Sequence, residues 1–367
     1  ESLLAAGYYR RPMDGLTQKA ARKLYGEDFE DSITRIEQFS ACAFAHFLTY
    51  GLGLRERQQY EFQAVDLGNV CHGALERYSK KVEENGYDWV EIPEAVRKQY
   101  VEESVDEAVT DYGNSVLYRS ARDEYMIVRM KRMLGCTVWA LTRQLRAGDF
   151  RPSAYELRFS YGKIDRVDTC TEDDRTYVKV VDYKTGSKAF DIISLYHGLQ
   201  LQLMVYMNGA CELEAKKHPE REVVPAGVFY YRIKDPLVEK LEETEIEEAI
   251  LKELRPDGIV NLKEEVLLHL DHLKGGESLA VPVKYNKNGA LAKGSKTVPE
   301  EEFLLMMRHA ARKVAKSHQM IMDGNTEAAP YRKGKETGCD YCQYRHVCGF
   351  DRKIPGYVYR EIEKVSK

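Results

Sequence analysis

The chain has 367 residues, of which 43% are hydrophobic and 31% are charged, and its formal net charge is −4. This composition is typical of a globular protein with one large domain or two ordinary ones. No apolar run approaches the length of a membrane span, so we expect no membrane partner. The chain begins with Glu1 and shows no signal-peptide pattern, so we expect a fragment of a longer cytoplasmic protein. The small net charge neither favours nor excludes nucleic acid.

The predicted elements run from helices to a small sheet and back to helices. Ser32 has the character of a capping residue ahead of the first clear helix. Alternation of apolar and polar residues predicts one strand over 154–168 and an antiparallel neighbour over 175–186. Other segments with helical spacing are 66–86, 94–147, 194–210, 238–254 and 299–323, a further strand is expected over 225–233, and a hairpin over 281–292. This order predicts an α/β fold with a mainly helical periphery.

Eight cysteines occur, and four of them sit singly among apolar neighbours, where buried free thiols are expected: Cys71, Cys136, Cys170 and Cys211. The segment "GCDYCQYRHVCGFD" instead holds three close cysteines, Cys339, Cys342 and Cys348. An odd number in a chain of cytosolic character argues against disulfides and for a metal site that lacks one ligand. Cys42 is the candidate fourth ligand. The spacing suits zinc and a [4Fe–4S] cluster equally.

The segment "VVDYKTGSK" ends an apolar run on Asp182 and Lys184. Successive side chains of a strand alternate between faces, so Val178, Val180, Asp182 and Lys184 should project from one side. The two valines can pack in a core, and the charges of Asp182 and Lys184 then lie together at the end of the strand. One interpretation is an edge ion pair before a Thr-Gly turn. The other is a metal ligand beside a catalytic lysine.

Three further segments stand in a suggestive order around this strand. A histidine is expected on a helix in "GNVCHGAL", an aspartate on a strand in "GKIDRVD", and a Gln-x-x-x-Tyr pair on one face of a helix in "QLMVY". These four residues are His72, Asp165, Gln202 and Tyr206. Together with Asp182 and Lys184, they resemble the active-site motif of the RecB-type branch of the PD-(D/E)xK nucleases. The resemblance implies a restriction-endonuclease-like core, with a small mixed sheet flanked by helices.

The two ends of the chain bring the resemblance closer to one subfamily. "SITRIEQFSACAFAHFLTYGLGLRER" and "CDYCQYRHVCGFD" resemble the C-terminal nuclease domain of the AddB family, the second subunit of bacterial AddAB helicase–nucleases. Ala43 and Thr185 depart mildly from that pattern. The resemblance implies that residues 1–31 lead in from a preceding domain and that residues 32–367 form the nuclease domain. It also implies a [4Fe–4S] cluster that staples the two ends together through Cys42, Cys339, Cys342 and Cys348.

The chemistry of phosphodiester hydrolysis accounts for the residue types of the motif. Asp165 and Asp182 supply hard oxygen ligands for Mg²⁺, and the backbone carbonyl of Tyr183 adds another. His72 as a ligand favours tolerance of Mn²⁺. Lys184 would orient or deprotonate water. The resemblance further implies single-stranded DNA as substrate, the 5'-terminated strand as the one that is cut, and a helicase–nuclease partner of the AddA type.

Gln202 and Tyr206 are expected to line the site and to touch DNA or Lys184. Glu156 lies at a motif-like position. If 154–168 is one strand, Glu156 faces away from Asp165 unless the strand bulges at Gly162. We therefore expect Glu156 to support the metal ligands without binding the metal itself. The basic residues Arg129, Lys131 and Arg132 are expected either to track a DNA backbone or to form a solvated helix face; they are three of eight in Arg119–Arg151.

Three alternatives to this interpretation are open at the level of sequence. They are a free-standing RecB-like exonuclease of the CRISPR-adaptation type, a catalytically silent fold that binds DNA ends, and a zinc-bound structural module. The sequence contains no G-x-x-x-x-G-K-[ST] motif, so no ATP motor is expected within this chain.

Overall fold

The computed structural model describes residue 2 and residues 15–26, 32–55, 63–113, 121–238 and 243–362. Its helices are α2 (Gln18–Tyr25), α3 (Ile33–Ala41), α4 (Ala43–His46), the π-helix η1 (Phe47–Gly51), α5 (Ala64–Glu84), α6 (Glu94–Gly113), α7 (Ala121–Leu145), α8 (Ile192–Tyr196), α9 (Gln202–Lys217), α10 (Glu243–Glu253), α11 (Glu264–Leu270), α12 (Glu300–Met322) and α13 (Arg345–Cys348). Among the described residues, no helix is both long enough and apolar enough to span a bilayer.

A six-stranded mixed sheet forms the centre of the fold, in the order β1-β2-β3-β4-β5-β8. Its strands are β1 (Arg151–Phe159), β2 (Gly162–Glu172), β3 (Arg175–Lys184), β4 (Glu222–Arg232), β5 (Asp257–Asn261) and β8 (Thr297–Val298). Strands β3 and β4 are parallel, and α8 and α9 make the connection between them. Short pairs elsewhere are β6 (Gly276–Glu277) with β7 (Lys284–Tyr285), and β9 (Tyr331–Lys333) with β10 (Glu336–Thr337) and β11 (Arg360–Glu361).

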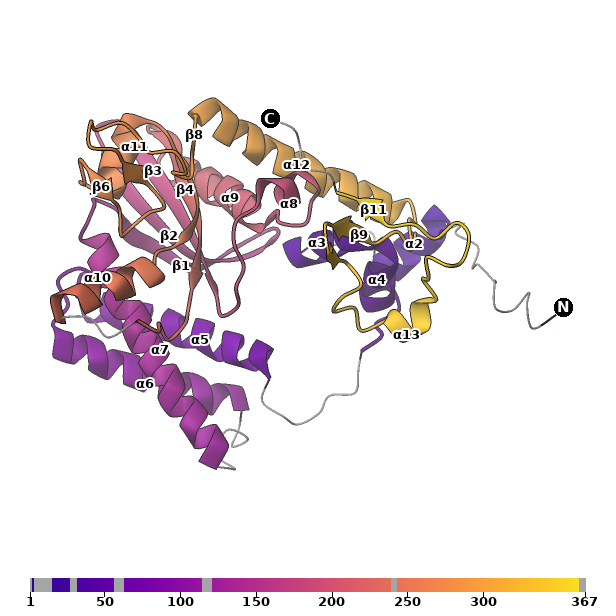
Figure 1. The fold of residues 1–367 in the computed structure, drawn as a ribbon, viewed down its shortest axis with the longest axis horizontal. Helices are drawn as coiled ribbons and strands as arrows, with labels where there is room; N and C mark the ends of the chain where they lie inside the picture. The colour runs from indigo at the N-terminus through magenta and orange to yellow at the C-terminus, as the bar shows by residue number, and fades with distance from the viewer. Residues whose placement is uncertain are drawn as a thin grey trace.

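Helices cover both faces of the sheet (Figure 1). The cluster on one face contains buried side chains of α5, α6 and α7, and the cluster on the other contains side chains of α3, α9 and α12. Strand β3 serves both clusters by alternation, because Val178 and Val180 belong to the second and Tyr177 and Val181 to the first. The predicted α/β fold, with a mixed sheet flanked by helices, is therefore confirmed.

Two predicted elements are wrong in extent, and a turn explains each. The single strand expected over 154–168 is a hairpin, in which Ser160 and Tyr161 separate β1 from β2. The helix expected over 194–210 breaks between α8 and α9, where Gly198 adopts a φ of +82° that other residues avoid. The segment with helical spacing over 94–147 contains α6 and α7, and residues 114–120 lie outside the described part of the chain. The hairpin expected over 281–292 is present as a bridge between Tyr285 and Leu291.

Segments from the two ends of the sequence pack against each other (Figure 1). Phe44 and Leu48 from the early part form a buried cluster with Tyr344 and Tyr357 from the late part. The Tyr344 hydroxyl lies 3.0 Å from Thr49 Oγ1 and donates a hydrogen bond of 2.8 Å to the Leu54 carbonyl. Apolar packing and hydrogen bonds thus join the two ends of the chain.

Candidate active site

The two aspartates of the motif meet where β2 and β3 separate. The last paired residues of the two strands are Arg166 and Val181, so Asp165 and Asp182 stand just beyond the ladder at the same end. The backbone N–H of Tyr183 has no strand partner there and donates a hydrogen bond of 2.7 Å to Asp165 Oδ2. This bond fixes the Asp165 carboxylate beside the end of β3.

Asp182 is a buried carboxyl group whose pKa is strongly displaced. Its side chain is 1% exposed, and its Oδ2 lies 2.5 Å from Lys184 Nζ. Gln202 Nε2 donates a hydrogen bond of 2.8 Å to Oδ1. Burial and the nearby Asp165 charge raise the pKa of Asp182 to about 7, against the smaller opposing effect of Lys184. The ionised form is therefore held at high free energy, and a cation at this position would lower it.

His72 reaches the same place from α5. Its Nδ1 lies 3.3 Å from Asp165 Oδ2, and the imidazole is about one-quarter exposed. Burial opposes protonation of His72, but the carboxylates of Asp165 and Asp182 outweigh it and raise the pKa of the imidazole. The charge of Asp165 contributes to both pKa shifts, and for Asp182 it adds to the larger effect of burial.

Glu156 belongs to this group, which corrects the expectation that it faces away. Because residues 154–168 form a hairpin, the pairs Tyr155–Arg166 and Leu157–Ile164 place Glu156 opposite Asp165 on the neighbouring strand. Directly opposed residues of an antiparallel pair share a face of the sheet. Donor atoms of His72, Glu156 and Asp165 all lie within 4.8 Å of one another. Burial is the main cause that raises the pKa of Glu156, whose carboxylate pairs with Lys163.

Gln202 and Tyr206 lie on one face of α9, as their spacing predicts, and are joined by a hydrogen bond of 3.0 Å from Gln202 Nε2 to the Tyr206 hydroxyl. Gln202 contacts Asp182, whereas we expected a contact with DNA or with Lys184. The start of α9 is fixed by a residue that the sequence did not reveal. Glu37 Oε1, from α3, accepts hydrogen bonds from the backbone N–H groups of Leu201 (2.7 Å) and Gln202 (3.0 Å).

The donor set of this site fits a divalent cation. Asp165 and Asp182 offer carboxylate oxygens and His72 offers a nitrogen, which are the ligand types of Mg²⁺ and Mn²⁺ sites. The Tyr183 carbonyl lies on the same edge of β3 as the N–H that binds Asp165, because both backbone groups of a strand residue point the same way. A bound cation would favour the ionised form of Asp182, whose pKa is raised by burial and by the Asp165 charge.

The four motif cysteines come from the two chain ends that pack together. Cys42 stands between α3 and α4, Cys339 and Cys342 lie in turns after β10, and Cys348 ends α13. Burial raises the pKa of Cys42 to about 11, and the Cys339 and Cys342 thiols add to this effect. Among the described residues, no three of the four bring their sulfur atoms within 4.8 Å of one another.

The basic residues Arg129, Lys131 and Arg132 lie on α7, which packs on α6. Lys131 Nζ lies 2.7 Å from Asp106 Oδ2, and Arg132 pairs with Asp235. Two of the three charges are therefore compensated within the fold. Their contact with DNA stays a prediction, and the ion pairs favour the alternative of a solvated helix face.

Comparison with known proteins agrees with this geometry. Residues 31–349 match the sequence model of the PD-(D/E)XK nuclease superfamily. Since that match covers most of the chain, the chain belongs to the PD-(D/E)XK nuclease superfamily.

Individual relatives show which kind of nuclease the chain is most similar to. The chain is 41% identical over its whole length to a subunit of the ATP-dependent helicase/deoxyribonuclease of Lachnoclostridium phytofermentans, of which it covers 33%. It is 32% identical to the subunit of that name from Alkaliphilus metalliredigens and 31% identical to the one from Clostridium acetobutylicum. Each of these two matches covers 98% of this chain and 33% of the relative. The chain thus spans about a third of the length of these relatives. The predicted resemblance to AddB-type nuclease domains is confirmed.

We expect Glu156→Gln to raise the Mg²⁺ concentration needed for half-maximal nuclease activity by roughly tenfold, because groups around metal ligands tune affinity by that order. The measurement is a Mg²⁺ titration of DNA hydrolysis, with Glu222→Gln at the other end of the sheet as the control. An unchanged Mg²⁺ requirement would leave Glu156 as a partner of Lys163 only.

Proposed function

We propose that this chain is a metal-dependent deoxyribonuclease domain that hydrolyses phosphodiester bonds of single-stranded DNA. The observation that carries the proposal is the convergence of Asp165, Asp182 and Lys184 at one strand end, with Asp182 buried beside a second carboxylate. Structural ion pairs do not need two adjacent carboxylates in a desolvated position, whereas a cation site does. Nuclease superfamily membership supports the same chemistry.

Each residue of the site has a distinct task in this proposal. Asp165, Asp182, His72 and the Tyr183 carbonyl would hold Mg²⁺, with tolerance of Mn²⁺. When bound there, a divalent cation supplies Lewis-acid stabilisation of charge on the scissile phosphate. Lys184, whose side chain is 24% exposed, can donate a hydrogen bond to a phosphate oxygen or to the attacking water.

Gln202 and Glu37 position the catalytic carboxylate. Glu37 fixes the first turn of α9, and this places the Gln202 amide against Asp182 Oδ1. The other carboxylate oxygen, Oδ2, is then directed at Lys184. A correctly oriented carboxylate and lysine lower the reorganisation that hydrolysis requires.

The whole-protein context is also a proposal. The relatives are named as subunits of an ATP-dependent helicase/deoxyribonuclease. We infer that this chain acts beside a partner subunit of the AddA type, on strands that the helicase separates at DNA ends, and that it cuts the 5'-terminated strand. In this proposal residues 32–367 form the nuclease domain and residues 1–31 lead into it.

We propose a [4Fe–4S] cluster at Cys42, Cys339, Cys342 and Cys348. The described segments that carry these thiols already pack together. The Phe350 N–H lies 3.4 Å from Cys348 Sγ, and hydrogen bonds to sulfur are a common feature of iron–sulfur sites. This hydrogen bond and the packing of the two segments support the proposed cluster.

An exposed surface formed by α8 and α12 suits the binding of a single strand. Tyr196, at the end of α8, is 52% exposed and stacks on His309, with ring centroids 5.1 Å apart and planes 8° apart. Lys313 and Arg360 lie near enough to lower the pKa of the adjacent His197, after the larger effect of burial. Aromatic rings among cations bind single strands by stacking and by charge. We propose that bases stack on the Tyr196–His309 platform.

We expect Asp182→Asn and Lys184→Ala each to lower the turnover of single-stranded DNA by at least about a hundredfold, because each removes charge stabilisation at the scissile phosphate. The assay is cleavage of end-labelled single strands in Mg²⁺, and Lys216→Ala on the exposed end of α9 is the control. DNA binding should persist in all three variants. Near-normal cleavage by either active-site variant would overturn the assignment.

We expect Cys339→Ala to lose the visible absorbance of an iron–sulfur cluster and to lower the thermal midpoint by roughly 5 °C or more, because it releases a clip between distant segments. Cys136→Ala, which removes a free thiol on α7, should do neither. Absorption spectra and iron analysis of anaerobically purified protein test this. Equal behaviour of the two variants would contradict the four-cysteine site.

We expect Tyr196→Ala to weaken single-strand binding by about tenfold at fixed salt, because one stacked base contributes about 1–3 kcal/mol. Turnover at saturating DNA should change little, since the metal ligands are untouched. The control is Tyr125→Ala, which removes a tyrosine from α7 that is even more exposed than Tyr196. If both variants bind single-stranded DNA as tightly as the parent does, bases do not stack on the Tyr196–His309 platform.

A further inference from the structure

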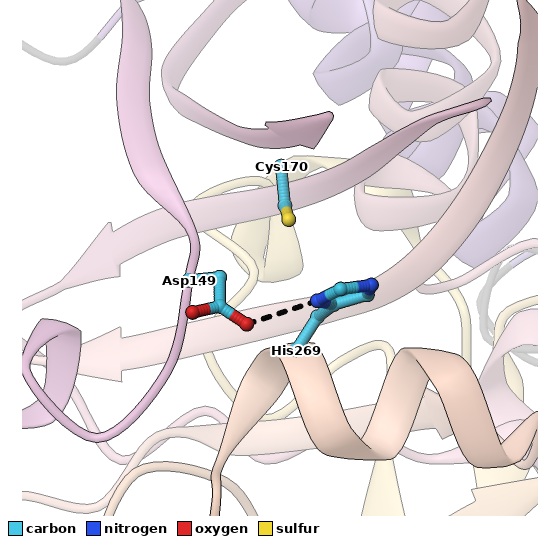
Figure 2. Close-up of side chains that lie close together, drawn as sticks. All are labelled: Asp149, Cys170 and His269. Carbon is cyan, nitrogen blue, oxygen red and sulfur yellow. Dashed lines mark hydrogen bonds and ion pairs between the residues drawn. The ribbon is translucent and has the colours of Figure 1, made fainter. Parts of the chain in front are cut away.

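A second group of metal-ligand side chains lies at the opposite end of β2 from the active site (Figure 2). It contains Asp149, from the loop before β1, Cys170, near the end of β2, and His269, on α11. One donor atom from each lies within 4.8 Å of the other two. Cys170 is five residues from Asp165, which along a strand is roughly 17 Å. The group is therefore separate from the nuclease site.

Two more side chains complete this group. His269 Nδ1 lies 2.9 Å from Asp149 Oδ2, and the Nε2 of His272, which follows α11, lies 3.0 Å from Asp149 Oδ1. The other nitrogen of His269, Nε2, lies 3.1 Å from Glu172 Oε2. In many metal sites a carboxylate holds the far nitrogen of a ligating histidine and so fixes its tautomer and orientation. Glu172 stands in that relation to His269.

The backbone holds these elements together without help from the side chains. The Asp149 N–H donates a hydrogen bond of 2.8 Å to the His269 carbonyl, and the His272 N–H donates one of 2.8 Å to the Ala147 carbonyl. Gly148 permits this approach, because a Cβ at that position would lie 2.3 Å from the His269 carbonyl oxygen. The Tyr177 ring packs on His269, with centroids 4.9 Å apart. The donors are thus preorganised.

We propose that Cys170, His269 and Asp149 bind a zinc ion, and that His272 holds Asp149 through its other oxygen. A thiolate and an imidazole are donors that favour zinc over Mg²⁺, and zinc also accepts a carboxylate oxygen. The three ligands come from the loop before β1, from β2 and from α11, so the ion ties these elements together. This explains why the Cys170 thiol, 7% exposed, points toward an ion-paired histidine; in a simple ion-pair network a thiol has no role there.

The test is metal analysis of the full chain, purified anaerobically and equilibrated with zinc, followed by removal of loosely bound ions. We expect one zinc per chain. Cys170→Ser and His269→Ala should lose it and keep their iron content. Cys211→Ser, at another buried free thiol, should keep the zinc, and so should Cys339→Ala, which excludes zinc held by the C-terminal cysteines.

A second measurement covers the case in which the core variants fail to fold. His272 is 59% exposed, so His272→Ala should fold normally and weaken zinc binding at least tenfold in competition with a chromophoric chelator. Co²⁺ substituted into the parent protein should show the thiolate-to-metal absorption of a cysteine ligand, and this band should vanish in Cys170→Ser. Absence of bound zinc in the parent, or zinc that persists in Cys170→Ser and His269→Ala, would overturn the proposal.

Discussion

Two carboxylates forced together in a desolvated position are the constraint on which the rest of this structure depends. The β2–β3 ladder ends at the pair Arg166–Val181, directly next to Asp165 and Asp182, so their side chains share the space where the strands part. Neither the Lys184 ammonium nor His72 brings the pKa of Asp182 back to its ordinary range. Such a carboxyl group is a cost to the fold, and it persists because the surrounding elements are rigid.

The elements that hold this position extend to the chain ends. Glu37 of α3 binds the N–H groups at the start of α9, and Gln202 at that start binds Asp182. The same helix α3 ends at Cys42, whose segment packs with the C-terminal cysteine segment. One short helix therefore connects the proposed cluster to Asp182. A disturbance at the cysteines would reach the active site through α3, without any contact between cluster and substrate.

Local periodicity predicted the parts of the site that lie on single elements. Alternation along β3 placed Asp182 beside Lys184, and the four-residue spacing on α9 placed Gln202 beside Tyr206. The sequence did not reveal Glu37, because its partner lies 164 residues away and no local pattern marks a capping contact at that distance. Glu156 was assigned to the wrong face for a different reason: one unrecognised turn at Ser160–Tyr161 reverses the strand and with it the parity.

The central claim is that a cation relieves the strain of the Asp165–Asp182 pair. The most direct test is the thermal midpoint of the parent and of Asp182→Asn, each measured in EDTA and across a Mg²⁺ titration. Ligand binding to the folded state stabilises it by RT ln(1 + [L]/Kd), so the midpoint rises with the concentration of free ligand. We predict that the parent midpoint rises with Mg²⁺, while Asp182→Asn is at least as stable as the parent in EDTA and does not respond to Mg²⁺. Equal Mg²⁺ responses, or a marked loss of stability of Asp182→Asn in EDTA, would contradict the account.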